Sequence, residues 1–411
     1  MSRAPRIAVI QPRLDGHGGL EKYGVFVIET LCRHWPVDVI TEHVVDLERV
    51  ERAFGVRLDR ANFICDPRCS PQPTLSGGVG GRLQRWRSAR DFHALTARYD
   101  LIIGQTIGLP YRSGAATSIM LCHFPVVRSD KVDTSLTGSW RLLLSSTGRE
   151  QRAIRARLAS WDRIICNSQF TQRWIRCYWA REATIVNPPI EKPDSPDLSA
   201  KRAWIVGVGF FGRPAGGPEE PWSYKRQELL IDTFKALCDS GLHGWELHLA
   251  GHVLPPTPEV HAYVGELRAR ADNYPVFLHP NCSHEELLGL YRQSSIFWHA
   301  TGYGVNDEQS PEKMEHFGMS TAEAMGWGCV PVVINKGGQQ EIVEHGKNGY
   351  LWDTLEQLRD TTAAVAQDHA ALQDLRLAAV ERAQYFGLER FRSQITELVR
   401  NELGTLKGLQ R

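Results

Sequence analysis

Two glutamates with seven residues between them frame the segment "EHFGMSTAE" (residues 315–323), just before the apolar run "CVPVVI". A carboxylate accepts charge-assisted hydrogen bonds from sugar hydroxyls, and a helix N-terminus attracts an anion such as a diphosphate. Ser320 followed by Glu323 matches a capping box, which predicts a helix start near Ser320 and gives Glu323 an ordinary structural role. Glu315 would then lie on the preceding loop, where Gly318 lets the backbone approach a ligand closely.

The elements that must position these side chains are short apolar strands alternating with helices. This alternation predicts a parallel, doubly wound α/β sheet, in which ligands bind at the carboxyl ends of the strands. Strands are expected in the first half within residues 6–12, 37–41, 99–106, 117–125, 162–168 and 183–190, and in the second half within 202–212, 245–251, 276–280 and 295–300.

The chain length of 411 residues exceeds what one hydrophobic core usually supports, so two domains are expected. A stretch with four prolines and no periodicity, "NPPIEKPDSPDLSAKR", separates the two sets of strands. We therefore predict an N-terminal domain over 1–190, a linker over 191–202, a C-terminal domain over 203–385 and a final amphipathic helix over 386–411 that crosses back to the N-terminal domain.

Charge is divided unevenly between the halves. Residues 1–200 carry 28 Lys/Arg against 20 Asp/Glu, whereas residues 201–411 carry 20 against 27. A mobile basic loop is expected over 71–90, and Arg149, Arg152, Arg155 and Arg157 are expected on a solvated helix face or against an anionic membrane or acceptor. Nucleic acid is not expected, because no nucleic-acid-binding motif accompanies the charge.

Neither a membrane span nor a metal site is indicated. The sequence has no run of ~20 apolar residues and no signal peptide at its start, so the expected location is the cytoplasm, with peripheral contact at the inner face of a membrane as an extension. The close pair Cys65 and Cys69 lacks the second pair or histidine cluster of a zinc site.

The region after residue 314 resembles the retaining glycosyltransferases of family 4, which have the GT-B fold. Glu315, Phe317, Gly318 and Glu323 match the family pattern, as does the continuation "AMGWGCVPVVINKGGQQEIVEHGKNGYLW". The resemblance implies that Glu315 contacts donor-sugar hydroxyls and that Glu323 holds the ribose of the nucleotide. It also implies that backbone amides around Phe317, Gly318 and Met319 touch sugar and phosphate.

Two cations after the first strand of the second half correspond to the family's diphosphate clamp, Arg213 in "FFGRP" and Lys225 in "YKRQE". The insertion "PAGGPEEPWSY" lengthens the usual spacing, so Arg226 is a rival to either of them. The alternative is that these residues are solvated surface cations. As clamps, they would stabilise the charge of the leaving group without a metal ion.

In the N-terminal half, "GHGGLEK" resembles the family's glycine-rich loop and places Gly18 and Gly19 against the donor. The G-x-G-x-x-G pattern of dinucleotide-binding folds fails there, which disfavours a dehydrogenase. His123 matches a histidine that many relatives point at the donor sugar. Other strand-end histidines, His299 among them, are interpreted as structural.

Together, the resemblance implies a GT-B architecture: two Rossmann-like domains with parallel sheets facing across a cleft. The expected reaction moves a hexosyl group from a GDP- or UDP-linked sugar to the hydroxyl of an unidentified acceptor, lipid- or glycan-linked, with retention of configuration and without a cofactor. Three alternatives stay open: a nucleotide-sugar epimerase, a phosphorylase or activated-sugar hydrolase, and a non-catalytic sugar-nucleotide binding protein.

Overall fold

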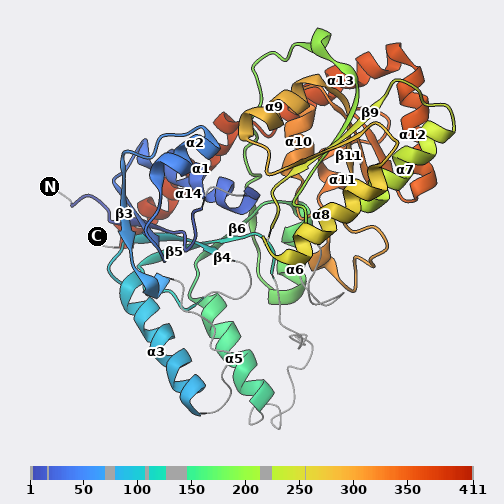
Figure 1. Ribbon diagram of the computed structural model, residues 1–411. Helices are drawn as coiled ribbons and strands as arrows, with labels where there is room; N and C mark the ends of the chain where they lie inside the picture. The colour runs from blue at the N-terminus through green and yellow to red at the C-terminus, as the bar shows by residue number, and fades with distance from the viewer. Residues whose placement is uncertain are drawn as a thin grey trace. The chain divides into compact units, whose positions relative to one another are not determined.

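The computed structural model describes residues 3–15, 18–69, 79–106, 111–125, 146–212, 225–254 and 256–409. Arg213 therefore lies outside the described residues. The chain divides into two units (Figure 1): the first unit is Met1–Pro188 with Glu389–Arg411, and the second is Pro189–Leu388.

The first unit contains a parallel sheet of seven described strands in the order β3-β2-β1-β4-β5-β6-β7. Strands β1 and β5 are buried at every residue, as expected for a sheet covered on both faces. The elements are β1 Ile7–Ile10, α1 Gly18–Cys32, β2 Val37–Thr41, α2 Leu47–Phe54, β3 Ala61–Cys65, η1 Pro67–Cys69, α3 Val79–Thr96, β4 Leu101–Thr106, β5 Thr117–Cys122, α5 Ser146–Ala159, β6 Arg163–Cys166, α6 Gln169–Trp179, β7 Thr184–Ile185 and α14 Leu388–Leu409.

The expectation of a mobile loop over 71–90 is wrong for its second half, because α3 already begins at Val79. Only half of the glycines that suggested a loop precede that residue, since Gly80 and Gly81 lie in the first turn of α3. From Arg82 onward the segment has good helix formers, and its last turns place Phe92 and Leu95 in the core of the first unit. Tertiary burial and local propensity therefore agree on a helix.

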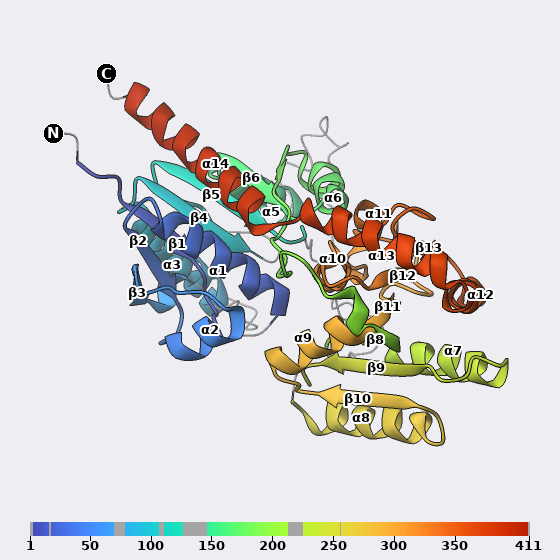
Figure 2. The ribbon, with the colours of Figure 1, turned by 90° about the horizontal axis from the view of Figure 1, so that it is seen from above.

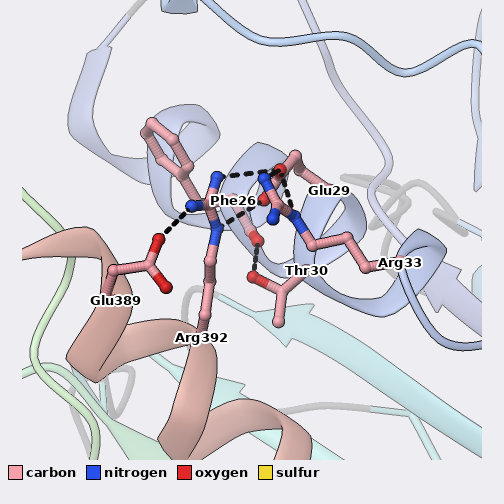
Figure 3. Close-up of polar contacts among 6 residues, drawn as sticks. All are labelled: Phe26, Glu29, Thr30, Arg33, Glu389 and Arg392. Carbon is pink, nitrogen blue, oxygen red and sulfur yellow. Dashed lines mark hydrogen bonds and ion pairs between the residues drawn. The ribbon is translucent and has the colours of Figure 1, made fainter.

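An ion cluster holds the C-terminal helix α14 on α1 within the first unit (Figure 3). Arg392 of α14 donates to both carboxylate oxygens of Glu29, at 2.9 and 3.1 Å. Arg33 approaches the same carboxylate at 2.6 Å, and Glu389 approaches Arg392. The side chains of Glu29 and Arg392 are only 11% and 17% exposed, so this pairing is largely shielded from water.

We predict that Arg392→Met lowers the free energy of unfolding of the first unit by about 3 kcal/mol, because it leaves the buried carboxylate of Glu29 short of one partner. The matched control is Arg400→Met on the exposed part of the same helix, with an expected change within about 0.5 kcal/mol. Urea unfolding of both variants checks this. Equal midpoints for the two variants would show that the ion cluster does not stabilise the docking of α14.

The second unit contains a parallel sheet of six described strands in the order β10-β9-β8-β11-β12-β13 (Figure 2). Its elements are η2 Leu198–Ala200, β8 Arg202–Val208, α7 Gln227–Asp239, β9 Glu246–Gly251, α8 Pro258–Ala271, β10 Val276–Pro280, α9 His284–Gln293, β11 Ser294–His299, η4 Pro311–Lys313, α10 Met319–Gly326, β12 Val330–Ile334, α11 Gln339–Ile342, β13 Tyr350–Trp352, α12 Leu355–Gln367 and α13 His369–Gln384.

Two cores enclose this second sheet, one on each face. Alternate strand residues such as Ile205 and Trp298 pack with α7, α8 and α12, whereas Val206 and Phe297 pack with α9, α10 and α13. The sheet is thus rigidly held between helical layers, and the loops at the carboxyl ends of its strands are free to carry a site. Among the described residues, no helix is long and apolar enough to cross a membrane, and no group of three or more His, Cys, Asp or Glu could hold a metal ion.

Candidate functional site

Lys225, His299 and Glu315 meet at the carboxyl ends of β8 and β11, which are neighbours in the middle of the second sheet. The Lys225 Nζ lies 2.6 Å from Glu315 Oε2, and the His299 Nε2 lies 3.2 Å from the same oxygen. Lys225 follows the loop after β8, His299 ends β11, and Glu315 lies on the loop after β11. The parallel topology therefore brings together three residues that are far apart in sequence.

The cluster determines the charge of Glu315. Burial alone would raise the pKa of its carboxyl, but Lys225 and the hydrogen bond from His299 outweigh burial, so the pKa is held well below its ordinary value. Burial, reinforced by the nearby ammonium of Lys225, lowers the pKa of His299. At neutral pH Glu315 is therefore a carboxylate and His299 is a neutral imidazole.

Two glycines after β12 make room for the Glu315 loop. The Gly338 N–H donates to the Glu315 carbonyl oxygen at 2.8 Å, and a methyl group on Gly337 would fall 2.3 Å from that oxygen. A methyl group on Gly338 would fall 2.4 Å from Phe317 Cα. The backbone at both positions must therefore be free of side chains for Glu315 to sit where it does.

Helix α10 begins close to Ser320, but its N-cap lies two residues earlier than a capping box of Ser320 and Glu323 requires. The N-cap is Gly318, with φ of 110°, and no side chain of the described residues caps the helix. Ser320 lies within the first turn, so the predicted helix start near Ser320 is confirmed, whereas its role as the N-cap is wrong. The Gly318 conformation, which favours glycine, turns the chain directly into the helix and leaves the first N–H groups without a side-chain acceptor.

A buried amide lies directly behind this helix start. The Gln339 side chain is fully buried, and neither its nitrogen nor its oxygen has a hydrogen-bond partner among the described residues. A methyl group on Gly318 would fall 2.9 Å from the Gln339 Nε2. The N-terminus of α10 thus combines unfilled backbone donors with an unfilled side-chain amide, which suits a polar or anionic ligand.

The other predicted residues of this segment lie on or beside α10. The Phe317 side chain is buried and packs edge-on against Phe386, so only its backbone is available to a ligand. Met319 opens the helix. Glu323 lies one turn further along α10. Burial of Tyr291 on α9 raises the pKa of its hydroxyl, and the charge of Glu323 raises it further, so Glu323 lies beside that buried ring.

Of the two rival cations, Lys225 is the one that contacts Glu315. Its aliphatic stem passes over Gly209, where a methyl group would fall 2.6 Å from Lys225 Cγ. The Arg226 guanidinium instead donates to the Tyr303 carbonyl oxygen at 2.9 Å and lies 3.6 Å from Glu228. Arg226 therefore anchors the long loop after β11 rather than the carboxylate.

In the first unit, His123 follows β5 and its ring is buried. The Gln105 Nε2 at the end of β4 donates to the Leu20 carbonyl oxygen at 2.6 Å and is also hydrogen-bonded to His123 Nε2. Gly18, with φ of 82°, and Gly19 form the first turn of α1 rather than a loop before it. Gln105 thus connects the start of α1 to His123.

The sequence did not predict a functional role for two residues of these clusters, His299 and Gln105. His299 was interpreted as structural because it has no metal-ligand spacing. The signal that could have identified it is its position: it is the polar last residue of the apolar strand that directly precedes the Glu315 loop. Gln105 is likewise a polar residue near the end of an apolar strand, one position before the last residue of β4, and β4 is next to the strand that leads into His123.

Comparison with known proteins supports a glycosyltransferase. Residues 222–383 match the family model described as Glycosyl transferases group 1. The GDP-Man:Man(3)GlcNAc(2)-PP-Dol alpha-1,2-mannosyltransferase of Dictyostelium discoideum is 20% identical over 452 residues, covering 96% of this chain and 84% of that protein. The matched region contains Lys225, His299, Glu315 and α10, so the cluster lies within the part of the chain that carries the family pattern.

Solved structures agree on the fold. A crystal structure of Anabaena HepE in complex with UDP and glucose has a TM-score of 0.64 at 17% identity, covering 96% of this chain and 99% of that one. Sucrose-phosphate synthase from Thermosynechococcus elongatus has a TM-score of 0.65 at 18% identity, covering 98% and 100%. The expected GT-B fold, with two parallel-sheet α/β units, is confirmed.

Proposed function

We propose that this protein is a retaining glycosyltransferase that moves a hexosyl group from a nucleotide-diphosphate sugar to an acceptor hydroxyl. The observation that supports this most is the ionised Glu315, paired with Lys225 and His299, on the loop that leads into the open N-terminus of α10. This arrangement offers an acceptor for sugar hydroxyls and donors for a diphosphate within one short segment.

In this proposal Glu315 accepts hydrogen bonds from donor-sugar hydroxyls and Glu323 holds the ribose. The N-terminus of α10 and the cations Lys225 and Arg213 neutralise the diphosphate as the bond from the anomeric carbon to its oxygen breaks. The acceptor oxygen forms the new bond on the same face of the sugar, and its proton passes to the departing phosphate. Fixed cations supply the charge stabilisation, so the proposal needs no metal ion.

In the first unit, His123, Gly18 and Gly19 are proposed to contact the donor sugar. The hydrogen bond to Gln105 fixes the His123 ring, and the first turn of α1 supplies backbone groups next to it. A fixed imidazole is well suited to contact a sugar hydroxyl, since either ring nitrogen can donate or accept depending on the tautomer.

The proposed donor is GDP-mannose and the proposed acceptor is a lipid- or glycan-linked sugar. Support comes from the Dictyostelium discoideum relative, whose name specifies GDP-Man and a dolichol-linked oligosaccharide. The competing donor is UDP-glucose, because HepE has been crystallised with it.

A thermal-shift titration tests the donor. A ligand present at 100 times its Kd adds about 2.7 kcal/mol to the stability of the folded state. We therefore expect GDP-mannose to raise Tm more than UDP-glucose does, with GDP and UDP alone as controls for the base. A larger shift with UDP-glucose would reverse the donor assignment, and no shift with any nucleotide sugar would contradict the proposed function.

A further inference from the structure

We infer that His299 is a positioning residue for Glu315: its neutral imidazole, protonated on Nε2, engages one carboxylate oxygen and leaves the other free to accept a donor-sugar hydroxyl. This inference rests on the proposed function and deepens it. The position of the proton on the His299 ring can be measured without any turnover.

The contacts of Glu315 fall on one side of its carboxylate. Lys225 Nζ and His299 Nε2 both approach Oε2, at 2.6 and 3.2 Å. For Oε1, the structure gives no contact with any described residue. The Glu315 side chain is 21% exposed whereas that of His299 is 2% exposed, so the carboxylate reaches the surface and the imidazole supports it from the interior.

The partners of the ring determine its tautomer. An ionised carboxylate can only accept, so the nitrogen facing it must carry the proton. The second neighbour of Nε2 is the Thr301 hydroxyl at 3.2 Å, which can accept a share of the same hydrogen. His299 Nδ1 is buried and has no partner among the described groups.

The same surroundings keep the ring neutral. An imidazolium would place a second buried N–H, on Nδ1, without an acceptor. It would also add a positive charge beside the Lys225 ammonium. The charged and titratable groups around the ring are Lys225 from the loop after β8, together with Glu315 and the neighbouring His316 from the loop after β11. Burial lowers the pKa of His316 to about 4, so that ring is neutral at neutral pH, and the negative charge that faces His299 comes from Glu315.

Two contacts from different elements fix the carboxylate better than one. A lysine ammonium is a compact charge on a flexible stem and accepts many carboxylate orientations. The imidazole at the rigid end of β11 restricts these to orientations in which Oε2 points inward. Without it, the carboxylate is expected to keep its lysine partner but to rotate, so Oε1 is no longer held towards the donor.

Two variants separate positioning from packing. His299→Gln keeps an N–H donor near the position of Nε2, and His299→Leu keeps similar volume without any donor. With nucleoside diphosphate release as the assay, we expect His299→Leu to lower kcat by about 10- to 100-fold. His299→Gln should restore kcat, and affinity for the nucleoside diphosphate alone should stay unchanged in both variants.

Imidazole ¹⁵N NMR of the wild-type protein provides the readout that needs no turnover, with the His299 signals identified by their absence in His299→Gln. We expect a neutral ring protonated on Nε2 from pH 5.5 to 8. An Nδ1-protonated ring, an imidazolium, or a His299→Leu variant with the kcat of the wild type would each overturn the inference. If the ring has the expected tautomer but the protein shows no transferase activity, the hydrogen bond between His299 and Glu315 stands and the proposed function is rejected.

Discussion

Glu315→Gln is expected to reduce turnover by about 100- to 1000-fold, the scale seen when a charge-stabilising group in an active site is removed. Glutamine has nearly the same shape, but it removes the negative charge and replaces one oxygen with an amide that donates. The Lys225 ammonium and the His299 N–H then face no carboxylate. Steady-state release of nucleoside diphosphate measures the loss, and binding of the nucleoside diphosphate alone should change little because Glu315 is proposed to contact the sugar.

Glu312→Gln is the matched control for this variant. Glu312 lies three residues earlier, within η4, and its side chain makes no hydrogen bond or ion pair with another described residue. We expect its turnover to stay within about twofold of wild type, as for surface substitutions away from a site. Equal rates for Glu315→Gln and wild type would remove Glu315 from the proposed mechanism.

Lys225→Met is expected to have the second-largest effect, on both donor affinity and stability. Its Nζ is the closest partner of Glu315, and the side chain is only 16% exposed. Removing one member of a shielded ion pair costs about 3 kcal/mol, because the remaining charge is left without its partner. Affinity for the donor should fall at least tenfold, since the same cation is proposed to contact the diphosphate.

The pH dependence of stability distinguishes the Lys225 pair from other charges. The pKa of Glu315 is lower in the folded protein than its ordinary value of 4.5, so the pair contributes fully above about pH 4.5 and its contribution is lost as the pH falls further. In Lys225→Met this part of the acid destabilisation should shrink. Arg226→Met is the comparison, because its guanidinium contacts Tyr303 and Glu228 instead. Identical acid profiles for Lys225→Met and wild type would contradict the assignment.

The fold was largely predictable because its signals are local and repeated. Short apolar runs such as 37–41 and 245–251 were each expected as strands, and the structure places a strand in each. Where several features competed, prediction failed. At Ser320 the capping-box pattern was present, but the N-cap is Gly318, whose φ is positive. The side chains that crowd Gly318 are Gln339 and Ile342, which the local pattern does not include.

The site was predictable only in part, because its partners come from different elements. Glu315 was identified by pattern, but its contacts with Lys225 and His299 depend on β8 and β11 being adjacent in the sheet, although these strands begin at Arg202 and Ser294, far apart in the sequence. The hydrogen bond from Gln105 to His123 likewise depends on β4 and β5 being neighbours. A sequence pattern records residue types, whereas these contacts follow from strand order.

The most direct test of the proposed function is a ¹³C NMR spectrum of the protein with GDP-mannose labelled at C1 and a panel of mannoside and lipid-linked acceptors. A retaining transferase gives a new α-configured glycoside signal that requires an acceptor and is lost in Glu315→Gln. A β-configured glycoside would contradict retention, and an isomerised nucleotide sugar without acceptor would indicate an epimerase. Free mannose formed from water alone would indicate a hydrolase, and undiminished product in Glu315→Gln would contradict the account of the site.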